Sequence, residues 1–597
     1  MIVKKGAIGL VLLLALGMTA KAEVKIGFEV SFTEPQAHYA EVEMNISGIN
    51  KDYIDVKMPV WTPGSYLVRE FSKSVEGFKA SASGKALRVE KVRKNIWRIF
   101  SAKAGQVKVN YRVYAFEISV RTAFIDASHA FLSSTSIFMY PDGYLKSPST
   151  VKVIPFTGWN KVSTGLEPVA GAQFTYTAPD FDILFDSPIE VGTQDVFDFM
   201  ASGVKHEVAM YGGGNYDKEK LKVDMAKVIE QETALYGENP NKHYMFIVHN
   251  YATGGGGLEH LNSTVLGASR NSYSTERGYK SFLELVAHEY HHLWNVKRLR
   301  PVALGPFDYD NENYTTNLWI AEGFTAYYEN KFMLRAGFTT PEGFVTALGN
   351  AVASVENTIG AKVQSAAAAS YDAWIKQYRP NENSGNTSVS YYTKGELVGL
   401  LMDLEIAHAT KGTKSLDDVM KAMYFQCKTL KRGYTDAEFK AMVEKVSGIS
   451  FTPFYEKYVT GVVPADYVTY FGYAGVKVTD VNAGKSIPYL GVASAKKEGK
   501  IMITSVSRNS AAWTDGINVN DEVISINDVP VEAAIERMPV ITGSKVGDVL
   551  KVTLKRDGIV RDFKVTLKAS PNIKLEAQID PAATPAQKAV LKKWMGI

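Results

Sequence analysis

The sequence predicts a multidomain α+β protein that begins with a β-sandwich and continues into a mainly helical region. Polar and apolar residues alternate with the period of half-buried strands early in the chain, as in residues 41–46 and 107–113. From about residue 215 to 460 the apolar residues recur at helical spacing instead. Short strands return between about residues 475 and 570, where Asp557-Gly558 indicates a tight hairpin.

The first 22 residues have the features of a signal peptide. Lys4 and Lys5 precede an apolar run of 12 residues, Gly6 to Gly17, and a small-x-small cleavage site, Ala20-Lys21-Ala22. The run is too short to span a bilayer comfortably, and no later stretch is apolar enough to do so. We therefore expect an exported protein, periplasmic or extracellular, without a stable membrane anchor. A short N-terminal anchor is the alternative.

Composition and charge exclude several classes of function. The 597 residues carry a formal net charge of +4, but removal of residues 1–22 leaves 64 basic against 63 acidic residues, a net charge of +1. This balance gives no general attraction for nucleic acid or for an anionic membrane. The single cysteine, Cys427, excludes an intrachain disulfide and Cys-rich metal modules. Any bound metal must be held by histidines and carboxylates.

The pattern divides the chain after the signal peptide into four parts. We expect an N-terminal β-sandwich over residues 23–205, a mainly helical domain over 206–470, a strand-rich module over 475–570 and an extension over 571–597. The extension contains Thr584-Pro585-Ala586-Gln587, which is typical of a helix N-terminus with a capping box. A final helix is therefore expected to follow it.

The strongest chemical signal is His288-Glu289-Tyr290-His291-His292, in a helical stretch. Residues four apart share one face of a helix, so His288 and His292 can point at the same ion. Two imidazoles and one carboxylate suit Zn²⁺ and leave a fourth position for water. Glu289 is better placed to take a proton from that water than to bind the ion. His291 lies off this face and is expected to pack behind the site. A chance match in an unrelated helix is the alternative.

The third metal ligand is expected to be Glu322. In one class of zinc peptidase the third ligand is a histidine six residues after the second, but that position is Arg298 here and the usual glycine is Asn295. Glu322 lies in an apolar, aromatic helical stretch, where a carboxylate needs a partner for its charge. Glu312 competes with it, but Glu312 lies in a polar segment where solvation explains its presence.

These residues carry a family resemblance. HEYHHLWN followed by LWIAEGFTAYYE resembles the thermolysin-like zinc peptidases with a glutamate as third ligand, the gluzincins, and among them the aminopeptidases. HEYHHLWNVKRLRP is similar to the glycyl aminopeptidase family of zinc peptidases with a C-terminal PDZ domain, and so are residues 61–70 and 119–123. The resemblance implies a thermolysin-like catalytic domain with one Zn²⁺ per chain. It also implies hydrolysis of the first bond of peptides that begin with glycine or alanine.

The resemblance suggests how the substrate amine is held. Gly256-Gly257-Leu258-Glu259-His260 is similar to the Gly-x-Met-Glu-Asn strand of zinc aminopeptidases, in which the glutamate binds the free α-amine. Glu259 would therefore select for an N-terminus and make the enzyme an exopeptidase. Gly256 and Gly257 would let the backbone come close to a bound peptide. The alternative is a glycine-rich loop with a solvated glutamate.

The resemblance also suggests how the reaction is assisted. Tyr392-Thr393-Lys394-Gly395 resembles the Tyr-x-Lys-Gly stretch whose tyrosine donates to the oxyanion of the tetrahedral intermediate. Tyr391 is adjacent and could take that role instead. Glu289 would accept a proton from the attacking water and pass it to the leaving amine.

Residues 475–570 resemble a PDZ domain. Tyr489-Leu490-Gly491-Val492 is similar to its carboxylate-binding loop, and residues 520–527 are similar to its characteristic strand. Such domains add an extended peptide to a sheet edge and hold its terminal carboxylate. The module would therefore bind the C-terminus of a peptide or protein. The alternative is an appendage that packs on the catalytic domain.

Two other functions stay open. A zinc endopeptidase would make no contact to an amine and would cleave N-acetylated peptides. A non-catalytic PDZ-based binding or scaffold protein would bind no stoichiometric metal. The complete set of His288, Glu289, His292 and Glu322 argues against a decayed site. The leading hypothesis is an exported zinc aminopeptidase that acts on peptides with a free N-terminus.

Overall fold

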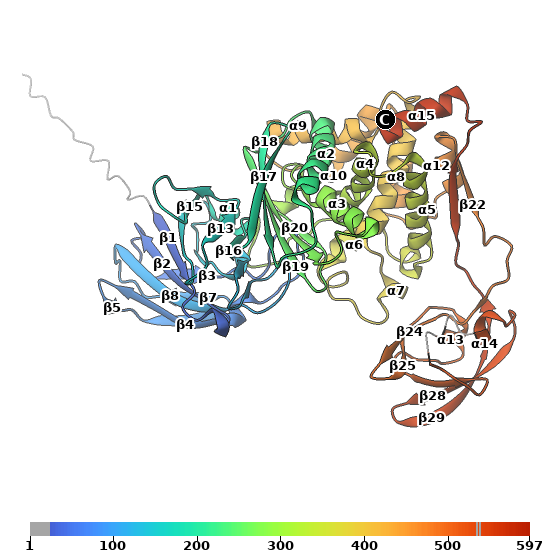
Figure 1. The fold of residues 1–597 in the computed structure, drawn as a ribbon, viewed down its shortest axis with the longest axis horizontal. Coiled ribbons are helices and arrows are strands. Elements are labelled where there is room, and N and C mark those ends of the chain that lie inside the picture. Colours follow the sequence, from blue (N-terminus) through green and yellow to red (C-terminus); the bar gives the residue numbers. More distant parts are fainter. Residues whose placement is uncertain (1–23, 533–534, 536–538) are drawn as a thin grey trace, which may run out of the picture.

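The computed structural model describes residues 24–532, 535 and 539–597, and it confirms the predicted multidomain α+β architecture (Figure 1). An N-terminal β-rich domain is followed by a mainly helical domain and a C-terminal strand-rich module. The predicted signal peptide, residues 1–22, lies outside the described residues. In the described part of the chain, no helix combines the length and the apolar character needed to span a bilayer.

The N-terminal domain has one eight-stranded and two four-stranded sheets around a common apolar core. Its elements are β1 (Lys25–Ser31), β2 (Tyr39–Ser47), β3 (Ile54–Lys57), β4 (Val75–Ala82), β5 (Lys85–Ala86), β6 (Val89–Arg93), β7 (Ile96–Ile99), β8 (Gln106–Tyr114), β9 (Phe124–Ile125), β10 (Ala130–Leu132), β11 (Tyr140–Pro141), β12 (Ser149–Ile154), β13 (Lys161–Thr164), β14 (Glu167–Pro168), β15 (Thr175–Ala178), α1 (Phe181–Phe185) and β16 (Ile189–Gly192). The large sheet has the order β14-β15-β12-β1-β2-β8-β4-β5. In β1, Ile26, Phe28 and Val30 are buried and alternate with more exposed residues, as the sequence pattern predicts.

The second domain opens with a mixed five-stranded sheet that the sequence analysis did not predict. Its strands are β17 (Asp195–Ala201), β18 (Val204–Tyr211), β19 (His243–Tyr251), β20 (Gly257–Glu259) and β21 (Ser263–Ser269). Their order is β17-β18-β19-β21-β20, so that β20 lies at an edge. The run YMFIVHN in β19 is buried throughout, so it lacks the alternation that identifies a half-buried strand.

Helices build the rest of this domain, and Figure 1 shows the sheet between them and the N-terminal domain. They are α2 (Lys218–Tyr236), α3 (Glu276–His291), the π-helix η5 (Trp319–Phe324), α4 (Thr325–Arg335), α5 (Pro341–Glu356), α6 (Ala366–Tyr371), α7 (Ser384–Thr387), α8 (Tyr391–Ala409), α9 (Leu416–Leu430), α10 (Asp436–Ser447), α11 (Thr452–Phe454) and α12 (Tyr467–Tyr473). α3 begins at Thr275, whose side chain accepts a hydrogen bond from the backbone of Gly278. It packs against β20 and β21 and carries the HExxH residues at its C-terminal end.

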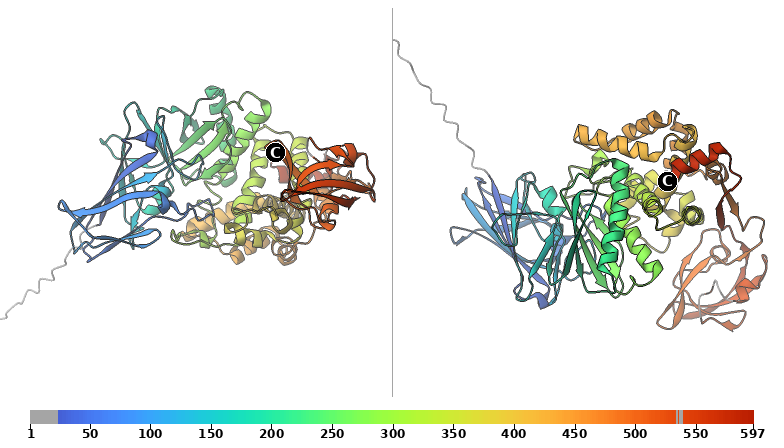
Figure 2. Two further views of the ribbon diagram at one scale, coloured as in Figure 1. Left: turned by 90° about the horizontal axis from the view of Figure 1, so that it is seen from below. Right: turned by 45° about the horizontal axis from the view of Figure 1, so that its top comes forward.

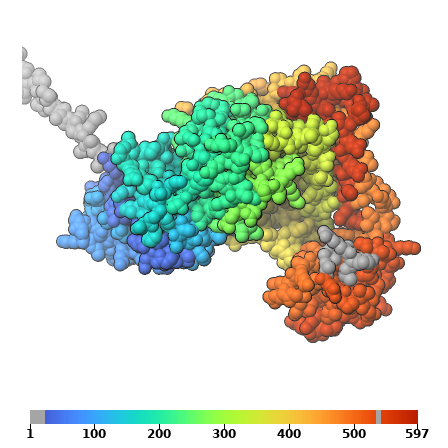
Figure 3. Space-filling model, in the orientation of Figure 1, coloured from blue at the N-terminus to red at the C-terminus, as the bar shows by residue number. Residues whose placement is uncertain are grey.

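The C-terminal module is a separate unit with its own apolar core. It contains β23 (Pro488–Tyr489), β24 (Val492–Lys497), β25 (Lys500–Val506), α13 (Ala511–Thr514), β26 (Glu522–Ile526), β27 (Val529–Pro530), α14 (Pro539–Thr542), β28 (Val549–Arg556), β29 (Ile559–Thr566) and β30 (Lys568–Ala569). Its main sheet has the order β24-β25-β26-β28-β29, with β24 at an edge. Figure 3 shows the module projecting from the helical domain.

The chain leaves the helical domain for this module and then returns to it. β22 (Val476–Asp480) leads out and pairs antiparallel with β31 (Leu575–Ile579), which leads back (Figure 2). α15 (Pro585–Met595) follows and begins at the predicted capping box. Its Trp594 is fully buried, and Trp594 Nε1 donates a 2.7 Å hydrogen bond to the Tyr327 hydroxyl of α4. The last helix therefore belongs to the core of the helical domain.

Part of the N-terminal domain also reaches into that core. Trp61 and Tyr66 pack with the helical domain's apolar residues rather than with the β-sandwich. Trp61 Nε1 donates a 2.7 Å hydrogen bond to the carbonyl of Asp308. The turn between these two aromatic residues, which contains Gly64, is thereby held beside β20.

Candidate metal centre and cleft

The structure brings the three predicted metal ligands together. His288 and His292 lie one turn apart at the end of α3, and Glu322 lies on η5. Glu322 Oε2 is 3.5 Å from His288 Nε2 and 3.3 Å from His292 Nε2. Two ligand atoms of a tetrahedral zinc ion with bonds of about 2.0–2.1 Å are separated by roughly 3.3 Å. The spacing therefore fits one zinc ion held by all three side chains.

Neighbouring groups orient the two imidazoles for this purpose. His288 Nδ1 donates a 2.7 Å hydrogen bond to Glu329 Oε2, and His292 Nδ1 donates a 2.6 Å bond to the carbonyl of Asn295. Both bonds leave Nε2 of each ring directed at Glu322. Metal-binding histidines usually have such a partner on the second ring nitrogen. Glu312 lines a different cavity and does not compete for the site.

A close approach of two helices places Glu322 beside α8. A Cβ atom on Gly323 would lie 2.4 Å from the Cα of Gly395, and one on Gly395 would lie 2.4 Å from the carbonyl oxygen of Trp319. No larger residue fits at either position without moving the backbone. The glycines of AEGF and YTKG therefore bring the third ligand and the predicted oxyanion donor to the same cleft.

The carboxylates of Glu322 and Glu289 differ in the direction of their pKa shifts. Burial alone would raise the pKa of Glu322, but the imidazoles of His292 and His288 outweigh it and hold that pKa well below its usual value. Burial raises the pKa of Glu289 to about 7, against the opposing effect of His288 and His292. Glu322 is thus suited to bind a cation and Glu289 to exchange a proton near neutral pH.

Glycines let the edge strand β20 pass directly over the HExxH helix. A Cβ on Gly257 would lie 2.2 Å from Glu289 Oε1, so that only glycine allows this contact. Gly256 has a φ of +78°, in the left-handed region that favours glycine. The residues Gly256, Gly257, Glu259 and Glu289 all line one cleft of about 360 Å³ with the metal ligands.

Glu259 lies in this cleft as a buried carboxylate with an unused oxygen. Its side chain is 4% exposed, and its Oε1 has no hydrogen-bond partner among the described residues. It approaches Glu289 and His292 closely enough for ligand atoms of all three to lie within 4.8 Å of one another. The Gly64 turn of the N-terminal domain covers it, since a Cβ there would lie 2.6 Å from Glu259 Oε2.

Of the two candidate tyrosines, Tyr392 lines the cleft. Its ring centroid lies 6.2 Å from that of His288. Tyr391 is fully buried, and its hydroxyl is 3.5 Å from the hydroxyl of Tyr378. Of the two, Tyr392 is therefore the tyrosine that lies where a bound substrate could be reached.

Several residues of the cleft were not predicted from the sequence, among them Glu329 and Arg121. Glu329, which holds His288, lies seven residues after Glu322, and this two-turn helical spacing is the signal that could have identified it. Arg121 comes from the N-terminal domain and lines the same cleft. Residues 119–123 carry part of the family resemblance, but they do not indicate that Arg121 reaches the cleft, because this position results from the packing of two domains.

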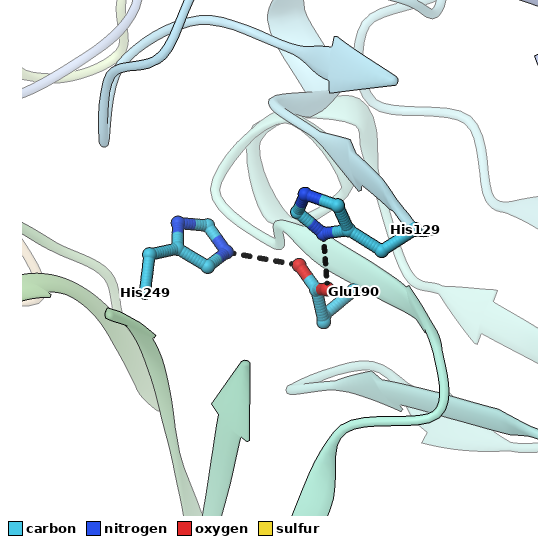
Figure 4. A group of neighbouring side chains, drawn as sticks. All are labelled: His129, Glu190 and His249. Atoms are coloured by element: carbon cyan, nitrogen blue, oxygen red, sulfur yellow. Dashed lines mark hydrogen bonds and ion pairs between the residues drawn. The ribbon is translucent and has the colours of Figure 1, made fainter. Parts of the chain in front are cut away.

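A second cluster of possible metal ligands connects the two domains. Figure 4 shows Glu190 of β16 between His129, which precedes β10, and His249 of β19. His129 Nδ1 is 2.7 Å from Glu190 Oε1, and His249 Nε2 is 2.9 Å from Glu190 Oε2. These are hydrogen-bond distances to two different oxygens, shorter than the spacing of ligands around one zinc ion. The cluster therefore ties the domains together through one buried carboxylate.

The predicted carboxylate-binding loop lies at the edge of the C-terminal module. Tyr489 ends β23, Leu490 and Val492 are buried in the module's core, and β24 begins at Val492. Gly491 has a φ of +82°, and a Cβ there would lie 2.0 Å from Ser510 Cβ. The module also contacts the helical domain, because Asn386 of α7 bonds at 2.8 Å to both the carbonyl of Val506 and the backbone N–H of Arg508.

Comparisons with known proteins agree with this description. A model of the peptidase M61 N-terminal domain matches residues 27–193, one of the M61 glycyl aminopeptidase matches residues 281–398, and one of the PDZ domain matches residues 488–567. The crystal structure of an aminopeptidase N family protein from Idiomarina loihiensis is 27% identical, with a TM-score of 0.89. That alignment covers 96% of this chain and all of the other chain.

Two more distant similarities were found. An M1 zinc metallopeptidase from Deinococcus radiodurans is 13% identical over 74% of this chain and 95% of its own, with a TM-score of 0.46. The serine endoprotease DegS of Salmonella typhimurium is 35% identical over 71 residues, which are 12% of this chain and 20% of DegS. The chain thus spans only a fifth of the length of that curated relative.

The fold and the site define a zinc metallopeptidase. The chain belongs to the M61 glycyl aminopeptidase family and carries that family's N-terminal domain, its catalytic domain and a PDZ domain. These matches confirm the family resemblance that the HExxH and LWIAEGF segments predicted.

Proposed function

We propose that this protein is an exported aminopeptidase with one zinc ion per chain, which removes glycine or alanine from the N-terminus of peptides. The observation that carries the proposal is the buried, partly unpaired carboxylate of Glu259 on an edge strand beside the metal ligands. The description of the matching catalytic family supports glycine as the residue removed.

His288, His292 and Glu322 would hold the zinc ion. When bound, zinc supplies Lewis acidity that lowers the pKa of a water molecule and polarises a carbonyl. The orphaned Oε2 of Glu289, which is buried without a hydrogen-bond partner among the described residues, faces no competing donor. It is therefore available to accept the proton of the attacking water.

The chain's own side chains then direct the reaction. Glu289 takes the proton of the water as it attacks the first peptide carbonyl and gives that proton to the departing amine. Burial raises its pKa, which favours acceptance of the proton. The Tyr392 hydroxyl donates a hydrogen bond to the carbonyl oxygen, which becomes negative in the transition state. Such a bond typically lowers the barrier by about 3 kcal/mol.

Glu259 would restrict the reaction to the N-terminal residue. A substrate ammonium offers three N–H donors to a carboxylate that is otherwise unpaired in a buried position. With the amine held there, only the first carbonyl of the peptide reaches Glu289. An acetylated N-terminus has no charge to offer and leaves Glu259 buried and uncompensated.

The proposal is tested with a Gly-Ala peptide in its free and N-acetylated forms, with and without a zinc chelator. We expect chelator-sensitive cleavage of the free peptide alone. Glu259→Gln should lower kcat/KM for the free peptide by roughly 10- to 100-fold, since it removes a charge-assisted contact. Glu312→Gln is the matched control outside the cleft. Equal cleavage of free and acetylated peptides would contradict the amine-binding role and indicate an endopeptidase.

Two further parts of the proposal concern the N-terminal segment and the PDZ module. Residues 1–22 would direct export and be removed, which N-terminal sequencing of the protein from a periplasmic or culture fraction would test. The edge strand β24 would bind the C-terminus of a substrate or a partner protein beside the loop of Tyr489–Val492. A peptide with an amidated C-terminus should then bind more weakly than the free acid.

A further inference from the structure

Arg121 brings a guanidinium group from the N-terminal domain into the wall of the cleft. Among the described residues that line this cleft it is the only lysine or arginine. The other charged side chains there include five carboxylates, those of Glu259, Glu284, Glu289, Glu322 and Glu329. A guanidinium among carboxylates is a selective site for an anionic group of a substrate.

The backbone of Arg121 is held in place, but the protein itself satisfies few of the hydrogen-bond donors of its guanidinium group. Its backbone N–H donates to Ser119 Oγ at 3.1 Å, and its carbonyl accepts from Ser133 Oγ at 3.3 Å. Its side chain makes a long hydrogen bond of 3.3 Å from Nη2 to the carbonyl of Gly257. Its Nε is buried without a partner among the described residues. A guanidinium offers five N–H donors, so most of them remain for a ligand.

Strand β20 defines the direction of a peptide bound in the cleft. The carbonyls of Gly256 and Leu258 face β21, where they accept hydrogen bonds of 2.9 Å from Gly267 N and Thr264 Oγ1. The carbonyl of Gly257 between them therefore faces the cleft, where Arg121 meets it. β20 thus has a free edge along which an extended peptide can lie.

Three groups follow one another along this strand. Glu259 lies at one end of β20, Glu289 lies against Gly257, and Arg121 lies beside Gly256 and Gly257. At about 3.3 Å per residue, the distance along the strand from Glu259 to Gly257 and Gly256 is roughly 7 to 10 Å. An extended peptide of two or three residues has about this length.

We propose that Arg121 binds the C-terminal carboxylate of short substrates, so that the enzyme prefers dipeptides and tripeptides to longer chains. This inference rests on the proposed aminopeptidase function and defines the length of its substrates. A guanidinium and a carboxylate form a paired, charge-assisted contact that a neutral amide cannot replace. An acidic side chain in the second residue would offer the same chemistry from a different source.

The test compares kcat and KM for Gly-Ala, Gly-Ala-amide, Gly-Asp-amide and Gly-(Ala)₉. For the wild-type enzyme we expect kcat/KM to be at least roughly tenfold higher for Gly-Ala than for its amide or for the long peptide. Arg121→Gln should lower kcat/KM for Gly-Ala by roughly 10- to 100-fold, mainly through KM, and leave the amide within about twofold. Arg121→Lys should restore part of the preference. The control is Arg88→Gln, on the exposed surface of the N-terminal domain.

Each outcome has a definite meaning. Equal rates for Gly-Ala and its amide would overturn the inference while leaving the aminopeptidase function intact. A preference for Gly-Asp-amide over Gly-Ala-amide that disappears in Arg121→Gln, without a preference for the free C-terminus, would assign the site to acidic side chains instead. Cleavage of none of the four peptides would reject the aminopeptidase function and the inference with it. If Arg121→Gln fails to fold, the wild-type ratio and Arg121→Lys still decide.

Discussion

The side chain of Glu329 shows how a single residue prepares the metal centre. Its Oε2 accepts the Nδ1 proton of His288 at 2.7 Å and so fixes the ring with Nε2 directed at Glu322. A carboxylate in this position also makes the imidazole a better metal ligand. Neither effect requires Glu329 to touch the metal or the substrate.

We expect Glu329→Gln to weaken zinc binding by about 10- to 100-fold, the usual effect of losing such a partner. The amide can still accept a hydrogen bond from Nδ1, but it carries no charge. Competition against a chelator of known zinc affinity measures the change. Glu342→Gln, on α5 outside the cleft, serves as the control. Unchanged zinc affinity in Glu329→Gln would show that the hydrogen bond alone is sufficient.

Glu289→Gln should have the opposite profile, with zinc retained and turnover lost. The glutamine cannot accept the proton of the attacking water, and loss of a general base typically lowers the rate by about 10²- to 10⁴-fold. Metal content by atomic absorption and kcat on a Gly-Ala peptide measure the two effects separately. Full activity in a zinc-loaded Glu289→Gln protein would contradict the mechanism.

At the scale of elements, the sequence predicted helices and half-buried strands better than fully buried strands. α2, Lys218–Tyr236, lies in the region from about residue 215 to 460, where the spacing of the apolar residues predicts helices. The buried strands β19 and β21 were missed, because their short apolar runs have no periodicity. The HExxH motif and Glu322 were predicted because metal binding limits both residue type and spacing. Arg121 depends on the docking of two domains and could not be predicted locally.

The end of α1 provides a pH-dependent contact between elements. The Asp186 side chain is 13% exposed and accepts hydrogen bonds from Lys297 Nζ at 2.8 Å and His260 Nδ1 at 3.0 Å. Burial opposes ionisation, but Lys297 and His260 outweigh it and lower the pKa of Asp186 to about 2 from an ordinary 3.8. Because the pKa of Asp186 is lower in the folded protein, the ionised carboxylate stabilises the fold at pH values above about 3.8. This stabilisation is lost as the pH falls towards about 2.

Asp186→Asn should therefore cost stability in a pH-dependent manner. We expect the free energy of unfolding to fall by about 2 kcal/mol between pH 5 and 7, and this difference should shrink as the pH falls from about 4 to 2. Urea titrations of both proteins at several pH values measure it. Asp198→Asn, at an exposed position in β17, is the control. A difference that stays constant down to pH 2 would show that the carboxylate's charge is not responsible.

At the scale of the whole molecule, the PDZ module is an insertion in the helical domain. β22 and β31 pair where the chain enters and leaves this module, and α15, which follows β31, packs in the helical core. The PDZ residues could thus be exchanged as a unit, whereas the residues that follow them belong to the peptidase.

Trp594→Ala should destabilise the helical domain by about 3–5 kcal/mol, since it removes a fully buried indole and its hydrogen bond to Tyr327. Thermal unfolding and the loss of peptidase activity on heating measure this effect. Trp513→Ala in the PDZ module, where the side chain is 46% exposed, is the matched control and should change the unfolding temperature little. Equal effects of both substitutions would contradict the assignment of α15 to the core.

The position of α15 also bears on which parts of the chain the peptidase needs. The helix that closes the core around Tyr327 follows the PDZ module in the sequence. A chain truncated within the PDZ module would contain every metal ligand and still lack the helix that completes their supporting domain. Peptidase activity is therefore expected only from chains that include α15, although no residue of this helix lines the cleft.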